Sequence, residues 1–86
     1  MIIEQIKQES GIDVTIKSRK REQVEMKALA SYLFRQKGLS LNEIGKELNL
    51  KNHATIIHHL KIYPMIKHYN PRVEELENLI NGVNPI

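Results

Sequence analysis

The sequence predicts an all-α protein built as a single small domain, and three observations support this fold class. Apolar residues recur at steps of three and four along most of the chain, which is the spacing of amphipathic helices. Helix-capping residues, glycine and proline stand between these segments. The 86 residues suffice for one core spanning 1–86 and are too few for a second core.

The N-terminal segment predicts a short helix followed by an irregular connection. Ile2, Ile3 and Ile6 form one apolar stripe, and Gly11 is a typical helix stop. Residues 12–16 alternate between apolar and polar, as a strand would, but the sequence offers no second strand to pair with them. We therefore expect a connection here.

The longest predicted helix covers about Lys20 to Lys37, a stretch without Gly or Pro. Its apolar residues recur at helical spacing: Val24, Ala28, Leu29, Tyr32 and Leu33. At about 100° per residue, Lys20, Lys27 and Arg35 fall in one sector of roughly 80°, with Ser31 between them. One face of this helix is therefore predicted to be a basic stripe.

The next two segments have the outline of a helix-turn-helix over about residues 40–63. Ser40 and Glu43 predict a capping box that opens the first helix. Gly45 lies inside that helix, where glycine lowers helix stability by roughly 1 kcal/mol, so we expect a neighbouring segment to approach closely there. Asn49 suits the left-handed position that ends a helix.

The second helix of this pair is expected to begin near Asn52 and to end at Tyr63, because Pro64 follows. Its buried side is predicted to consist of Ile56, Ile57, Leu60 and Tyr63, with Ala54, His58 and Lys61 opposite. A last helix is predicted from the N-cap Asn70 and Pro71 to Asn81 and Gly82. Its buried residues are expected to be Val73, Leu76, Leu79 and Ile80.

Basic charge is concentrated in the middle of the chain. The formal net charge is only +3, but twelve of the 13 Lys and Arg residues lie between residues 14 and 72, together with only four of the ten Asp and Glu. This distribution favours a polyanionic partner such as nucleic acid. A solvated charged face explains it equally well until a motif is considered.

The composition argues against several other classes of protein. Without cysteine the chain has neither a disulfide nor a thiolate zinc site. No apolar run approaches the roughly 20 residues that cross a bilayer, and the N-terminus lacks the basic and apolar regions of a signal peptide. We therefore expect a cytoplasmic protein that binds no membrane, has no cofactor and takes no small-molecule substrate.

Three of the four histidines lie in the stretch "KNHATIIHHLKI", residues 51–62. Two metal ligands on one helix need a spacing of three or four residues, whereas His53 and His58 are five apart and His58 and His59 are adjacent. No Asp or Glu lies in this stretch to complete a metal site or to orient a catalytic histidine. The sequence therefore favours neither a metal site nor an enzyme.

The sequence predicts different environments and roles for these three histidines. His58 and His59 are expected to be partly solvated. Two roles stay open for His53: packing on the apolar side of its helix against Ile56 and Ile57, or contact with base edges in the major groove from the start of the second helix.

At this point the residues resemble a known family. The run "GLSLNEIGKELNLKNHATIIHHLKI", preceded by "KSRKREQVEMKALASYLFRQ", is similar to the C-terminal DNA-binding domain of the bacterial replication initiator DnaA. The resemblance extends from about Ile2 to Ile80 and implies a helix-turn-helix of the Trp-repressor-like type. It also implies a protein that reads an asymmetric DnaA box in double-stranded DNA as a monomer.

The resemblance further implies which residues contact DNA. Arg19 would enter the minor groove, which attracts arginine where it is narrow and A/T-rich. Lys20, Lys27 and Arg35 would contact phosphates, with Lys27 standing where the family usually has arginine and therefore lacking the bidentate fork. The start of the recognition helix would supply Lys51, Asn52, His53, Ala54 and Thr55.

Two of these reading residues depart from the family pattern. Asn52 stands where the family has Asp, and Ala54 where it has Ser or Thr. Because an Asn amide suits adenine and an Ala methyl suits the thymine methyl, we expect a target site that differs from the standard box.

The phosphate-binding glycine loop of the initiator's ATPase domain does not occur in the sequence. Together with the Met start and the altered reading residues, this favours a stand-alone protein in replication initiation or its regulation. Two other functions stay open. One is a small transcription regulator of phage or mobile-element type, and the other is a helical module whose basic face binds an acidic protein. Other replication proteins are further candidate partners.

Overall fold

The computed structural model describes residues 2–82, and this range folds into helices with no strand. The all-α fold class is therefore confirmed. The helices, in chain order, are α1 Ile2–Ser10, α2 Arg21–Gln36, α3 Leu41–Leu48, α4 His53–Tyr69 and α5 Pro71–Ile80. None of them is long and apolar enough to cross a membrane.

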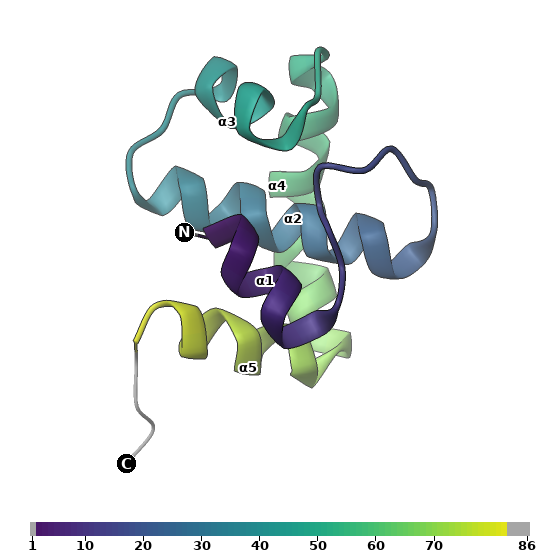
Figure 1. The fold of residues 1–86 in the computed structure, drawn as a ribbon, viewed down its shortest axis with the longest axis vertical. Helices are drawn as coiled ribbons and strands as arrows, with labels where there is room; N and C mark the ends of the chain where they lie inside the picture. Colours follow the sequence, from purple (N-terminus) through teal and green to yellow (C-terminus); the bar gives the residue numbers. More distant parts are fainter. Residues whose placement is uncertain (1, 83–86) are drawn as a thin grey trace.

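The central helix is α2 (Figure 1). It contacts the other four helices, most extensively α4, which crosses behind it in Figure 1. α3 packs on one end of α4 and α5 on the other, while α1 lies in front of α2 and against α5. The core forms where these helices meet, and its largest fully buried side chains include Tyr63, Ile6, Leu29, Leu33, Ile44, Leu48 and Ile56.

The first connection has the predicted character. α1 ends at Ser10, and Gly11 follows with a φ of 76°, which favours glycine over residues with a Cβ. Residues 12–16 form a turn and no strand. Val14 is fully buried and Ile12 is half-buried against the core, while Ile16 is exposed, so Ile12 and Val14 anchor this connection.

The α3–α4 turn forms as the sequence predicts. Both hydrogen bonds of the capping box are present: Glu43 N–H donates to Ser40 Oγ at 3.2 Å, and Ser40 N–H donates to Glu43 Oε1 at 3.0 Å. Asn49 adopts the left-handed conformation (φ 57°) that ends α3. Gly45 faces the turn, where an added Cβ would lie 2.7 Å from the carbonyl oxygen of Leu50.

The predicted end of the second helix at Tyr63 is wrong, because α4 continues through Pro64 to Tyr69. Proline removes one backbone hydrogen bond and typically destabilises a helix by about 3 kcal/mol. Pro64 is exposed, and Leu60, whose carbonyl loses this donor, is half-buried. Burial of Ile66 and the hydrogen bond from Tyr69 Oη to Glu25 Oε2 at 2.7 Å offset that loss.

The predicted buried faces of α4 and α5 are wrong at three positions. Ile57 is 52% exposed and Leu79 is 56% exposed, whereas His59, expected to be partly solvated, is only 5% exposed. The buried residues of α4 are Ile56, His59, Tyr63 and Ile66, an alternation of three- and four-residue steps. Because α4 packs on α2 along this stripe, His59 is buried and Ile57 faces the solvent.

Buried polar groups join the second half of α4 to α5 and α2. Glu77 accepts hydrogen bonds from Tyr63 Oη at 2.7 Å and from Lys67 Nζ at 3.2 Å. Burial and the neighbouring carboxylate raise the pKa of Tyr63, so its hydroxyl stays a proton donor. On the other side, buried Glu25 accepts from Tyr69 and from Asn70 Nδ2. The part of α4 beyond Pro64 is therefore fixed by hydrogen bonds as well as by packing.

Glu77→Ala is expected to lower the free energy of unfolding by about 2–3 kcal/mol, because it leaves the buried Tyr63 hydroxyl and the Lys67 ammonium without their acceptor. Glu75→Ala, an exposed change on the same helix, should alter it by less than about 0.5 kcal/mol. Urea denaturation of both variants measures the difference. Equal losses for the two would contradict a structural role for the Tyr63–Glu77 bond.

Candidate nucleic-acid interface

Three neighbouring grooves open around the α3–α4 turn, and no acidic residue among residues 2–82 lines any of them. The first lies between α3 and the start of α4, the second between the turn and Lys17, and the third between residues 17–19, α2 and α4. We call the surface around them the cationic face and define it by the exposed residues Lys17, Arg19, Lys46 and Lys51 together with residues 52–55.

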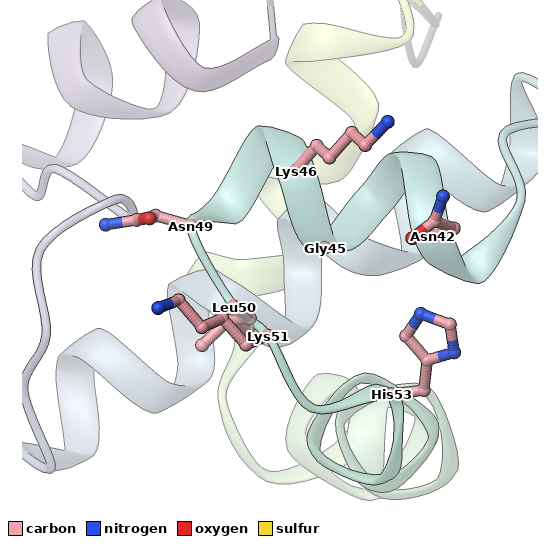
Figure 2. A pocket seen from close by; sticks show the side chains of 7 residues that line it. All are labelled: Asn42, Gly45, Lys46, Asn49, Leu50, Lys51 and His53. Carbon is pink, nitrogen blue, oxygen red and sulfur yellow. The ribbon is translucent and has the colours of Figure 1, made fainter.

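Figure 2 shows the first of these grooves. Asn42 and Lys46 project from α3, while His53 projects from the start of α4 toward the side where Asn42 lies. His53 is exposed, so it does not pack into the core against Ile56. The turn that carries Lys51 separates the two helices and keeps both sets of polar side chains open to solvent.

Asn52 holds the N-terminus of α4. Its Oδ1 accepts a hydrogen bond from the backbone N–H of Ala54 at 2.9 Å, as an N-cap residue does. The cap occupies one acceptor position and leaves the Nδ2 amino group free to donate. Ala54 is exposed beside it, and Thr55 is half-buried at the rim of the second and third grooves.

The loop before α2 places Arg19 beside α4. Asp13 folds the loop by accepting from the Thr15 backbone N–H at 2.9 Å and from the Thr15 hydroxyl, and these bonds lower the pKa of Asp13. Gln23 Nε2 donates to the Asp13 carbonyl at 3.0 Å and so ties the loop to α2. Lys17 and Arg19 then reach the grooves that Thr55 also lines.

The prediction of a basic stripe along α2 is wrong, because the three cations do not form one continuous exposed surface. Lys20 and Arg35 are exposed at opposite ends of the helix, but Lys27 is only 5% exposed and Ser31 is fully buried, because α4 packs over the middle of this face. Arg35 also donates to the carbonyl of Leu39 at 2.9 Å, which holds the α2–α3 connection. Lys27 instead lines the third groove.

The structure adds residues that the sequence analysis missed. Lys17, Asn42, Lys46 and Asn49 line the grooves and are exposed. Positions 42, 46 and 49 are spaced by four and three, opposite the buried stripe of α3, so a helical projection of α3 could have found them. Lys17 gives no such signal because its position depends on the fold of the loop.

Comparison with known proteins decides the family. Residues 1–62 match the family described as "Bacterial dnaA protein helix-turn-helix". The chain belongs to the DnaA helix-turn-helix family. The matched part includes the whole cationic face and ends within α4, so Pro64 and α5 lie beyond it.

A curated relative supports the DnaA assignment. The chain is 36% identical over 69 residues to the chromosomal replication initiator protein DnaA of Bacteroides thetaiotaomicron. That similarity covers 74% of this chain and 15% of the relative, so the chain spans only a small part of that initiator's length. No solved structure matches the chain.

The DnaA helix-turn-helix is a DNA-binding domain and not a catalytic one. Within residues 2–82, no group of three or more His, Asp or Glu residues could hold a metal ion. The two ion pairs of the same range are Arg21–Glu25 and Lys67–Glu77, so the cations of the cationic face are not neutralised internally.

Proposed function

We propose that this DnaA-family chain binds double-stranded DNA sequence-specifically, with α4 in the major groove and Arg19 in the adjacent minor groove, in replication initiation or its regulation. The observation that carries the proposal is the exposed first turn of α4, flanked by unpaired cations and lined by no carboxylate. The free N–H groups and dipole at this helix end add to the attraction for phosphate.

The two sides of α4 suit the two strands of a duplex. Lys46 on α3 lies on one side of the helix start, and Lys17 and Arg19 lie on the other. A recognition helix in the major groove therefore has cations beside it for the phosphate backbones. One helix and one arginine from the same chain read an asymmetric site, so we propose that a monomer suffices.

The geometry of Asn52 sharpens its proposed role in reading bases. Because its Oδ1 caps α4, the amino group is the part most free to approach DNA, and it donates to acceptors such as N7 and O6 of guanine, N7 of adenine or O4 of thymine. Ala54 presents a methyl group suited to the thymine methyl. We therefore propose a target that differs from the standard DnaA box at the bases these two residues face.

Selection from a random-sequence duplex pool tests the proposal. We expect a single asymmetric consensus related to the DnaA box but altered at one or two base pairs. Recovery of no consensus, together with equally tight binding to an acidic polypeptide such as polyglutamate, would instead favour a module that docks an acidic protein.

Binding to the selected duplex is expected to weaken steeply with salt. If four to six cationic side chains contact phosphates, the slope of log K against log salt concentration should be about −4 to −5. Fluorescence anisotropy titrations at several salt concentrations measure this slope. A slope near zero would contradict phosphate contacts by the cationic face.

A further inference from the structure

α4 exposes one large apolar side chain within its first two turns. Ile57 is 52% exposed and does not belong to the core, whereas the preceding Ile56 is fully buried. Ala54 lies three residues before Ile57 and Lys61 four residues after it, and both are exposed as well. Residues at these steps share one side of a helix, so Ile57 stands between Ala54 and Lys61 on the outward surface of α4.

The other exposed large apolar side chains of residues 2–82 are placed differently. Ile16 lies in the loop before α2, Leu79 lies in α5, and Met65 and Tyr69 lie in the part of α4 beyond Pro64. Ile57 alone among them is on the first two turns of α4, directly after residues 52–55 of the cationic face. A partner that binds these residues therefore also reaches Ile57.

A DNA major groove that accepts the first turn of α4 also accepts the second. The groove is about 12 Å wide and about 8.5 Å deep, so a helix enters it with more than its first residue. Ile57 lies about 4.5 Å beyond Ala54 along the helix axis, and successive base pairs are about 3.4 Å apart. In the proposed complex Ile57 therefore faces a base pair within about two steps of the one that Ala54 faces.

The side chain of Ile57 suits one chemical group in that groove. It has no hydrogen-bond donor or acceptor, and the C5-methyl group of thymine is the apolar group that base pairs present there. Opposite a cytosine amino group or a guanine carbonyl, Ile57 would displace water without replacing its hydrogen bonds. Because isoleucine is branched at Cβ, few χ1 rotamers are open to it in a helix, and little side-chain entropy is lost on contact.

The surroundings of Ile57 favour DNA over a protein as its partner. The exposed residues beside it on α4 include His58 and Lys61, and the cationic face adjoins it. A stable protein interface covers about 800 Å² on each partner around an apolar centre, which one isoleucine among polar residues does not provide. A single methyl-to-methyl contact within a polar interface is instead ordinary in DNA recognition.

We propose that Ile57 is a specificity-determining residue whose methyl groups pack against the C5-methyl group of one thymine in the major groove. The inference rests on the proposed DNA binding and extends the surface of α4 that reads bases from the first turn to the second. The consensus selected from the random duplex pool should therefore contain a thymine at the base pair that Ile57 faces.

Replacing each thymine of the selected duplex in turn by deoxyuridine tests the proposal, because this change removes only the C5-methyl group. At one position the loss should weaken binding of the unmodified protein by about three- to fivefold, as expected for one buried methyl group. Ile57→Ala should bind the thymine and deoxyuridine duplexes alike at this position, since the protein side of the contact is already gone. It should still distinguish them at the thymine that Ala54 faces.

Met65→Ala is the matched control, since Met65 is also an exposed apolar residue of α4 but lies eight residues further along the helix. This variant should keep the affinity of the unmodified protein and its dependence on every thymine methyl group. Both substitutions are at exposed positions, and circular dichroism verifies that the two variants remain folded.

The outcomes separate the contact from the proposed function. No duplex binding by the unmodified protein overturns the proposed function and the contact together. Sequence-specific binding in which no thymine methyl group depends on Ile57 overturns the contact alone. If Ile57→Ala instead weakens every duplex of the scan equally, Ile57 packs on the deoxyribose backbone and does not determine specificity. If it disperses a dimer seen by sedimentation and leaves DNA binding unchanged, Ile57 is a protein contact, and the proposal is wrong.

Discussion

Gly45→Ala is expected to lower the free energy of unfolding by about 1–2 kcal/mol, although alanine is the better helix former by roughly 1 kcal/mol. The new Cβ would lie 2.7 Å from the carbonyl oxygen of Leu50 and 3.2 Å from Cδ1 of Ile56. Ile56 can adjust, but the carbonyl belongs to the backbone of the α3–α4 turn. The turn must therefore move for the Cβ to fit.

The same displacement should reduce DNA affinity, since the turn sets the position of α4 relative to α3. Urea denaturation gives the stability, and duplex titration under folding conditions gives the affinity. Lys46→Ala, at the next position of α3, is the matched control: it should leave stability within about 0.5 kcal/mol and weaken binding only by its lost charge. A Gly45→Ala protein as stable as the unmodified one would show that the helices do not approach as closely as described.

Gly45 also illustrates which parts of the fold were predictable from sequence. The capping box of Ser40 and Glu43, the left-handed Asn49 and the glycine act within one turn of chain, so their residue types identify them directly. For the same reason the bounds of α2 and α3 were predicted within about one residue. Local chemistry decides these features, and no distant contact competes with it.

The errors occur where distant contacts outweigh local preference. A proline ends most helices, but α4 continues through Pro64. As a result, Ile66 becomes buried and Tyr69 forms a hydrogen bond to Glu25. Likewise, a histidine at position 59 favours solvent by residue type, and an isoleucine at position 57 favours burial. In the structure His59 is buried and Ile57 is exposed, because α2 covers only one stripe of α4.

The candidate site was predictable in its centre and less so at its edges. The resemblance to the DnaA family pointed to the start of α4 and to Arg19, and the structure brings them to one surface. The prediction of an exposed basic stripe on α2 was wrong because a helical projection gives the angle of each residue but not which helix packs on each face. Lys27 has the predicted angle and is nevertheless covered by α4.

Arg19→Ala is expected to weaken binding to the selected site by about 10- to 100-fold, and to do so in a sequence-dependent way. Arg19 is exposed and lines the groove beside α4, on a loop that is tied to α2 through Gln23. A guanidinium inserted in a narrow A/T-rich minor groove gains from the groove's enhanced negative potential, and a G·C pair blocks it with the guanine amino group.

Base-pair substitutions in the duplex separate this minor-groove contact from a contact with phosphate. Replacing an A·T pair by inosine·cytosine alters the major groove but adds no amino group to the minor groove, whereas replacing it by G·C adds one. At the base pairs that Arg19 faces, the unmodified protein should tolerate inosine·cytosine and lose affinity with G·C. Arg19→Ala should bind both duplexes alike.

Lys20→Ala is the matched control for this test. Lys20 is the next residue, is exposed and carries the same charge, but does not line the groove beside α4. Its loss should weaken binding by a few-fold on every duplex, as expected for a phosphate contact. If Arg19→Ala behaves in the same uniform way, Arg19 contacts the backbone, and the sequence specificity must come from α4 alone.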